Sequence, residues 1–201
     1  AVATDGHRMA RAEIAAPEGA KGMSGIIVPK KTVGEVQKLL DGVDGDVHVE
    51  VSDTKIRFTV GPVVLLSKLI EGTFPDYDRV TPKNNDKQMI VDKQSFAVAV
   101  DRVSTIASDR GGKAVKLSAN NGLLDLSVTN PDHGTASEEV AVEFETDGFE
   151  IGFNARYLLD IIGQIRTESA VFLFNDANSP TLVKEEGGQA NALYVLMPMR
   201  V

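Results

Sequence analysis

The chain has 201 residues, no cysteine and a formal net charge of −8. This length fits one large or two small domains, and the lack of cysteine excludes disulfides, thiolate metal sites and a cysteine nucleophile. The negative charge argues against a protein that holds nucleic acid by overall attraction, because phosphate contacts require clustered Lys and Arg. The absence of cysteine also favours a cytoplasmic setting, and the apolar runs are far shorter than the roughly 20 residues of a membrane helix.

A unit of one strand, one helix and three strands recurs three times along the chain, at spacings of roughly sixty residues. In the first unit, an apolar strand at 25–28 precedes a helix at 30–40. The apolar residues of this helix share one face, as helical periodicity requires: Val33, Val36, Leu39 and Leu40. Turn residues then separate three short strands, which we expect at 47–51, 55–60 and 63–69.

The second and third units follow the same order. In the second we predict a strand at 88–91, a helix at 93–109 that stops at Gly111 and Gly112, and strands at 114–118, 123–128 and 139–144. In the third, Asn154 is a favourable N-cap between a strand at 150–153 and a helix that carries Leu158, Ile161, Ile162 and Ile165. Its remaining strands are predicted at 170–174, 181–184 and 193–197.

Residues 1–14 are interpreted as the last strand of a unit whose beginning is missing. Because the chain also begins without a methionine, we expect a fragment that starts inside a domain. Pairing of units would give two domains, residues 1–80 as the latter part of one and residues 81–201 as a complete one. The pattern favours an α+β fold with antiparallel sheets and helices on one face.

The polar segment TDGHR at residues 4–8 leaves three roles open. It could be a turn stabilised by capping and salt bridges, an interaction surface, or a hydrolase-type site centred on Asp5, His7 and Asp76. Catalysis is the weakest of the three, because no nucleophile, second carboxylate or glycine-rich phosphate loop completes a site. We therefore expect no active site, and no cofactor or metal is predicted.

Two further features have alternative interpretations. The apolar C-terminal segment at residues 194–201 is either a final strand or the wall of a groove, since Pro198 ends the strand and methionines suit surfaces that accept several partners. Basic residues concentrate in the three helices, while acidic residues concentrate in strands and loops. These helices either present solvated faces or form a weakly basic lining for sequence-independent phosphate contact.

Four separated segments resemble the bacterial replication sliding clamp, the beta subunit of DNA polymerase III. They are VATDGHRMA at 2–10, SKLI with Gly72 and FPDY at 67–77, IGFN with YLLD at 151–160, and YVLMPMR at 194–200. The resemblance covers the whole chain. It implies a DNA-clamp fold, in which two subunits of three domains each close head to tail around duplex DNA. This chain would be the latter part of the middle domain and the whole C-terminal domain.

The resemblance also implies a hydrophobic pocket between these two domains, where partner proteins insert short linear peptides. Met9, Val80, Val195 and Met197 would form its apolar floor, while His7, Arg8, Asn154 and Arg200 would orient the peptide. The full set carried over by motif is Thr4, Gly6, His7, Arg8, Met9, Pro75, Arg79, Val80, Asn154, Tyr157, Val195, Leu196, Met197, Pro198, Met199 and Arg200.

The same resemblance implies that the helices line the ring and favours the basic lining. The expected phosphate contacts come from Lys30, Lys31, Lys38, Arg102 and Arg166, and Ile106 is expected near the subunit interface. The implied function is polymerase processivity. Implied partners are duplex DNA, the DNA polymerase III alpha subunit, the clamp loader, other DNA polymerases and repair proteins, with the full-length protein a homodimer. An oligomerising module without a DNA role is the alternative.

The sequence departs from the family pattern at two places. Residues 108–113 lack the large aromatic side chain expected near the pocket edge, which predicts a more open rim. Pro180 stands where a small polar residue is more usual.

Overall fold

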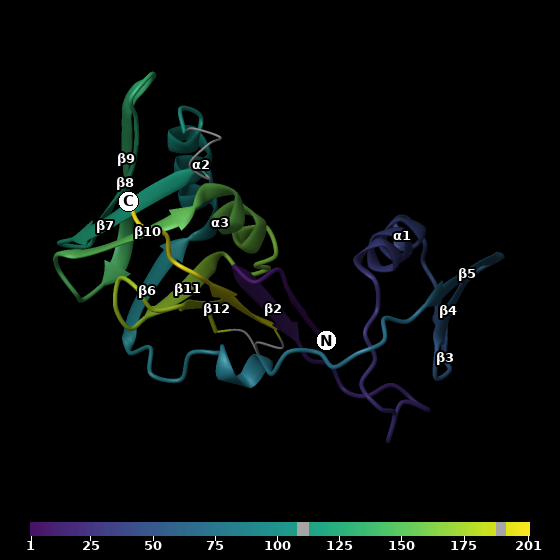
Figure 1. Cartoon of the computed structure of the whole chain (residues 1–201). Helices are drawn as coiled ribbons and strands as arrows, with labels where there is room; N and C mark the ends of the chain where they lie inside the picture. The colour runs from purple at the N-terminus through teal and green to yellow at the C-terminus, as the bar shows by residue number, and fades with distance from the viewer. Residues whose placement is uncertain (108–112, 188–191) are drawn as a thin grey trace. The chain divides into compact units, whose positions relative to one another are not determined.

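The computed structural model of the chain describes residues 1–107, 113–187 and 192–201. Within these ranges the chain forms two compact units, each with its own antiparallel sheet (Figure 1). The larger unit is Ala1–Ala15 with Tyr77–Val201, and the smaller is Ala16–Asp76. Across the described ranges, no helix combines the length and apolar character needed to cross a membrane. The predicted α+β class is confirmed.

The larger unit contains two copies of the predicted repeat. The first copy consists of β6 (Lys87–Asp92), α2 (Lys93–Ser104), β7 (Ala114–Asn120), β8 (Leu123–Asn130) and β9 (Gly134–Phe144). The second consists of β10 (Phe149–Asn154), α3 (Ala155–Ile162), β11 (Ser169–Phe174), β12 (Thr181–Glu185) and β13 (Ala192–Leu196). A hairpin of β1 (Val2–Thr4) and β2 (Arg8–Ala12) and a short 3-10 helix η1 (Tyr77–Arg79) belong to the same unit.

The opening strand of each repeat pairs with a strand of the other repeat, and β6 also pairs with β9 of its own repeat. β6 pairs with β11 of the second repeat, where Asp92 lies opposite Ser169. β10 pairs with β7 of the first repeat, where Asn154 lies opposite Ala114. The order of the described strands in this sheet is β1-β2-β13-β12-β11-β6-β9-β8-β7-β10. Each repeat therefore supplies a strand to its partner.

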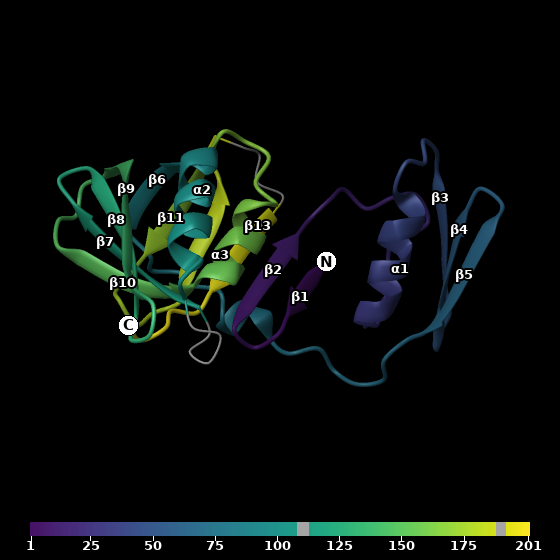
Figure 2. The ribbon, with the colours of Figure 1, turned by 90° about the horizontal axis from the view of Figure 1, so that it is seen from above.

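The two helices of the larger unit bury apolar side chains against these strands. Phe96 of α2 and Leu158 and Ile162 of α3 are buried, and α2 and α3 lie side by side in both views (Figures 1 and 2). The ring centroid of Phe96 lies 5.4 Å from that of Phe172 on β11. Aromatic pairs of this kind contribute about 0.5–1.5 kcal/mol beyond the burial of the rings. Burial of Leu158 and Ile162 holds α3 in the core, and α3 carries part of the candidate site.

Polar side chains set where these helices begin. Asp92 accepts a hydrogen bond from the backbone N–H of Ser95 at 2.8 Å, and Asn154 accepts one from the backbone N–H of Tyr157 at 3.2 Å. Each bond satisfies an N–H group that has no partner within the helix. The predicted N-cap Asn154 is therefore confirmed.

The smaller unit packs α1 (Lys30–Leu40) near a sheet of β3 (Val47–Val51), β4 (Lys55–Val60) and β5 (Val63–Lys68). Ile56 and Val60 of β4 are buried. The predicted apolar face of α1 is only partly covered in this unit, because Val33 is 54% and Leu40 is 39% exposed. The strand predicted at 25–28 is wrong. This segment is irregular, although the Ile27 carbonyl accepts a hydrogen bond from the Ile70 N–H at 2.9 Å.

Several predicted boundaries change. The second helix ends at Ser104 instead of residue 109, and its predicted stop at 111–112 lies outside the described residues. The third helix ends at Ile162, with Ile165 buried beyond it. Residues 1–14 form a hairpin instead of a single strand, because Gly6 turns the chain with a φ of 86°, a conformation that favours glycine.

Candidate functional site

The turn between β1 and β2 is organised by Asp5. Its Oδ1 accepts hydrogen bonds from the backbone N–H groups of His7 and Arg8, each at 3.0 Å, and the Thr4 hydroxyl donates to the Arg8 carbonyl at 2.8 Å. Burial raises the pKa of Asp5, but the hydrogen bonds from His7 and Arg8 outweigh it, so the net pKa lies below its ordinary value. The carboxylate that the hydrolase alternative requires is therefore committed to capping the turn.

Arg8 joins this turn to α3. Its Nε donates to Asp5 Oδ2 at 3.0 Å, and its Nη1 donates to Asp160 Oδ2 at 2.6 Å. The guanidinium carbon lies 4.2 Å from the ring centroid of Tyr157, within cation–π range. Burial lowers the pKa of Arg8, but the carboxylates of Asp160 and Asp5 outweigh it and the net pKa is raised. The guanidinium is therefore a fixed cation at the contact between the β1–β2 hairpin and α3.

The segment after β13 is tied to the same turn and to β10. The backbone N–H of Met197 donates to the His7 carbonyl at 3.0 Å, and that of Met199 donates to the Gly152 carbonyl at 2.8 Å. Pro198, between them, has no N–H to donate. This segment, residues 197–201, is called the tail below. Its first three residues therefore run between two backbone anchors.

Met9 and Val195 lie directly opposite each other in the β2–β13 pair. Because side chains alternate along a strand, both lie on the sheet face opposite to that of Arg8. They are 4% and 3% exposed, so two of the four side chains of the predicted apolar floor are covered in this structure. The accessible apolar surface of the predicted set comes instead from Met197, at 42% exposed, and Val80, at 53%.

All the predicted peptide-site residues except Pro75 belong to the larger unit. They come from the first hairpin, from η1 and the residue after it, from the start of α3, and from β13 with the tail: Thr4, Gly6, His7, Arg8, Met9, Arg79, Val80, Asn154, Tyr157, Val195, Leu196, Met197, Pro198, Met199 and Arg200. The guanidinium carbon of Arg11 on β2 lies 5.8 Å from the Tyr77 ring centroid, which places η1 near the hairpin. Leu196 is fully buried and belongs to the hydrophobic core, so it anchors β13 instead of lining a surface.

The predicted phosphate-facing residues lie on α1 and α2 and in the segment that follows α3. They are Lys30, Lys31 and Lys38 on α1, Arg102 on α2 and Arg166 after α3, and all are exposed. Lys38 donates to Glu35 at 3.0 Å, and Arg102 donates to Glu138 of β9 at 2.6 Å. These carboxylates partly neutralise the two cations, so Lys30 and Lys31 offer the stronger basic patch.

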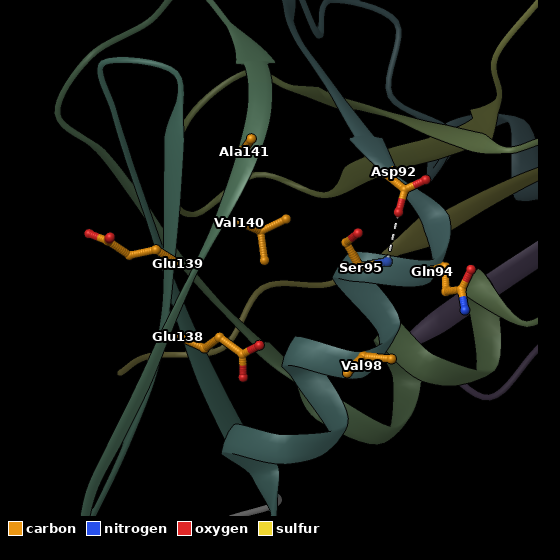
Figure 3. A pocket seen from close by; sticks show the side chains of 8 residues that line it. All are labelled: Asp92, Gln94, Ser95, Val98, Glu138, Glu139, Val140 and Ala141. Carbon is orange, nitrogen blue, oxygen red and sulfur yellow. Dashed lines mark hydrogen bonds between the residues drawn. The ribbon is translucent and has the colours of Figure 1, made fainter.

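An open surface cavity of about 540 Å³ lies between α2 and β9 (Figure 3). Its lining is Asp92, Gln94, Ser95, Val98, Glu138, Glu139, Val140 and Ala141, and it shares no residue with the sites predicted from the sequence. Ile106, predicted at the subunit interface, follows α2 and is half-buried. Its carbonyl accepts a hydrogen bond from the Asn130 side chain at 2.7 Å.

The two departures from the family pattern have different outcomes. Residues 108–112 lie outside the described part of the chain, so the predicted open rim stays a prediction. At the other, the carbonyl groups of Pro180 and Leu173 accept hydrogen bonds from the Asn85 side chain at 2.9 and 2.7 Å. The turn at Pro180 is held through backbone atoms, which a proline provides as well as a small polar residue.

Sequence reasoning assigned no role to Asp160 or Gly152, although both belong to the motifs quoted for the resemblance. The only sequence signal for Asp160 is a carboxylate placed one turn after Tyr157 on a helix. Gly152 is an interior glycine in a predicted strand, which can mark a close approach of another backbone.

Two repeats share one antiparallel sheet, and the β1–β2 hairpin pairs with β13 and binds the tail. This arrangement places the protein in the DNA-clamp class of folds. Residues 1–76 match the family model of the DNA polymerase III beta subunit, central domain, and residues 78–200 match that of its C-terminal domain. The chain therefore belongs to the DNA polymerase III beta-subunit family, the bacterial sliding clamps.

Named relatives agree with this assignment. The beta sliding clamp of Caulobacter vibrioides (strain NA1000 / CB15N) is 50% identical over 201 residues, and that of Escherichia coli (strain K12) is 36% identical over 204 residues. Each alignment covers 100% of this chain and 54% of the relative. A solved sliding clamp from Bartonella birtlesii, bound to griselimycin, has a TM-score of 0.94 and 54% identity, covering 100% of this chain and 54% of its own. The chain thus spans about half the length of these relatives.

Proposed function

We propose that this chain is the partner-binding part of a clamp that encircles duplex DNA and confers processivity on the replicative polymerase. Its partners are the DNA polymerase III alpha subunit, the clamp loader, and other DNA polymerases and repair proteins. The full-length protein is a cytoplasmic homodimer without an active site of its own. A closed ring is retained on DNA by topology, so a tethered polymerase stays at high effective concentration near the primer end.

The observation that carries the peptide-binding part of this proposal is the anchoring of the tail. Residues 197–199 run from the His7 carbonyl to the Gly152 carbonyl, beside the Arg8 and Tyr157 contact. Met197 and Val80 supply accessible apolar surface, while the turn supplies polar groups for a peptide backbone. Sliding clamps from Bartonella birtlesii and Pseudomonas aeruginosa are solved with griselimycin bound, which supports a ligand site in this family.

The DNA-facing surface is proposed to be the exposed sides of the helices. Lys30, Lys31, Lys38, Arg102 and Arg166 make weak contacts with phosphates, consistent with a ring that must move along DNA. Ile106 lies near the contact between subunits.

The division into a middle domain at 1–80 and a C-terminal domain at 81–201 is also proposed. The family models, which divide near residue 77, support it. The compact units group differently, because β2 pairs with β13 and so joins residues 1–15 to the larger unit.

The test is fluorescence polarisation of a labelled peptide of the Gln-Leu-x-Leu-Phe type against the chain and against a variant that lacks residues 197–201. Saturable binding that disappears with the deletion is the expected result. A scrambled peptide of the same composition is the control for apolar adhesion, and circular dichroism confirms that the deletion variant is folded. Absence of binding to the folded, intact chain would overturn the proposed peptide site.

A further inference from the structure

Gly152 of β10 lies where the tail crosses the edge of the sheet. A Cβ atom placed on Gly152 would lie 2.4 Å from Val201 Cγ1 and 2.7 Å from the Met199 carbonyl oxygen. Both distances are far below van der Waals contact. The backbone of Gly152 is not in the left-handed region, so its conformation is open to any residue. The requirement for glycine at this position is therefore steric, and it comes from the tail.

The two faces of β10 have different neighbours at this point. Ile151 and Phe153 are 3% and 0% exposed and belong to the core, and the alternation of a strand directs position 152 to the opposite face. Gly152 is nevertheless buried, while Val201 is 63% exposed. The tail therefore covers Gly152, and the missing side chain makes room for it.

The tail is held at two positions that are two residues apart, Met199 by Gly152 and Met197 by His7. Met199 forms an isolated antiparallel bridge with Gly152, and Met197 is held by the His7 carbonyl. Because Pro198 has no N–H, the described hydrogen bonds of residues 197–199 to neighbouring strands and turns are these two. Displacing Met199 would leave the segment held at one end.

We propose that Gly152 is a positioning residue for partner binding, because it admits the tail to the edge of β10 and so fixes the wall formed by residues 197–200. The inference rests on the proposed peptide-binding function and adds a residue that acts without touching the peptide. A side chain at position 152 displaces Met199 and Val201, and the apolar surface of Met197 loses its fixed orientation.

The variant Gly152→Ala tests this with two readouts. The first is hydrogen exchange of the Met199 amide, which should become about tenfold faster as its hydrogen bond to Gly152 is lost. The second is the Kd for the fluorescein-labelled peptide Gln-Leu-Ala-Leu-Phe, which should rise about tenfold. Gly45→Ala is the matched control, since a Cβ there meets nothing within 4 Å, and both quantities should stay at the wild-type level.

A double variant guards against simple misfolding. In Gly152→Ala with Val201→Gly, the two closest side-chain contacts at 2.4 and 2.8 Å are removed, while the contact with the Met199 oxygen remains. Partial recovery of Met199 protection or of peptide affinity supports the contact between Gly152 and the tail. If Gly152→Ala is unfolded, partial recovery of folding in the double variant supports it as well. If Gly152→Ala is unfolded, and neither the double variant nor Gly152→Ala truncated after Pro198 is folded, position 152 acts through something other than the tail and the inference is overturned.

The remaining outcomes separate this inference from the function on which it rests. If the wild-type chain binds the peptide and folded Gly152→Ala binds it equally well, Gly152 has no positioning role and the proposed function stands. If wild type fails to bind, the proposed function falls and the positioning role falls with it. If hydrogen exchange of the Met199 amide is unchanged in folded Gly152→Ala, the claim that the glycine makes room for the tail is overturned.

Discussion

The guanidinium carbon of Arg8 lies 4.2 Å from the ring centroid of Tyr157. The same guanidinium donates to Asp5 and Asp160, so a residue of the first hairpin is fixed against α3 by two carboxylates and one ring. The hairpin turn that binds the tail through the His7 carbonyl is thereby attached to α3, whose N-cap is Asn154. Three segments distant in sequence are held as one surface through Arg8.

Replacing Arg8 by lysine should weaken the contact between the β1–β2 hairpin and α3. An ammonium group cannot reproduce the two directed hydrogen bonds and the stacking of a planar guanidinium. Because the groups are partly exposed, we expect a loss of about 1 kcal/mol in the free energy of unfolding, and a peptide Kd about five- to tenfold higher. Urea unfolding and fluorescence polarisation measure the two effects. Arg11→Lys, whose ring contact is longer at 5.8 Å, is the control and should change both much less.

The first hairpin should be sensitive to acid. The net pKa of Asp5 is lowered in the folded chain, so its carboxylate stabilises the fold above its ordinary pKa of about 3.9. That contribution is lost as the pH falls through the lowered value. The stability difference between wild type and Asp5→Asn should be constant from about pH 5 to 8 and should shrink below about pH 4. A difference that grows on acidification would contradict the assignment, and Asp44→Asn in a loop of the other unit controls for charge alone.

Thr181 offers a stabilising substitution. Its side chain is fully buried, and its hydroxyl oxygen has no hydrogen-bond partner in the described structure. Thr181→Val replaces an unsatisfied hydroxyl by a methyl group of similar shape, so the free energy of unfolding should rise by about 1 kcal/mol. Thr167→Val makes the same change where the hydroxyl donates to the Ser169 carbonyl at 2.7 Å. This substitution should lower the free energy of unfolding. Equal effects at both positions would show that satisfaction of the hydroxyl is not the cause.

The proposed DNA lining can be tested by charge reversal. In the assembled full-length clamp, Lys30→Glu, Lys31→Glu and Lys38→Glu together should weaken DNA binding and reduce the salt slope by roughly one for each lost phosphate contact. The control reverses three other exposed lysines, Lys55, Lys68 and Lys83, which changes the net charge equally. If both triple variants lose the same affinity, total charge is responsible and the lining assigned to α1 is wrong.

Much of the fold follows from local sequence signals. Asn154 is a polar cap directly before an apolar helical pattern, and the helix begins there. The strands 47–51 and 55–60 were predicted with their observed bounds, because apolar alternation and turn residues are both local. Helix ends were predicted less well. α3 ends at Ile162, although the apolar pattern continues to Ile165, which is buried by tertiary packing instead.

The residues of the candidate site were proposed from the family resemblance, whereas the contacts among them are not contained in the sequence pattern. The Arg8 and Asp160 pair joins positions separated by 152 residues, and no periodicity connects them. Met9 and Val195 were predicted in the apolar floor of the pocket, and both are buried where β2 pairs with β13. Burial on a sheet face depends on what covers that face, and this is decided by the assembled fold.

The exchange of β6 and β10 between the two repeats makes their unfolding mutual. If one repeat lost its structure, the other would lose a neighbouring strand and expose an unpaired edge rich in apolar side chains. Nicking the chain between β9 and β10 would thus give two fragments, each lacking a strand that the other holds. Mixed together, such fragments should restore the sheet by mutual strand complementation, whereas either fragment alone should present an open template for aggregation.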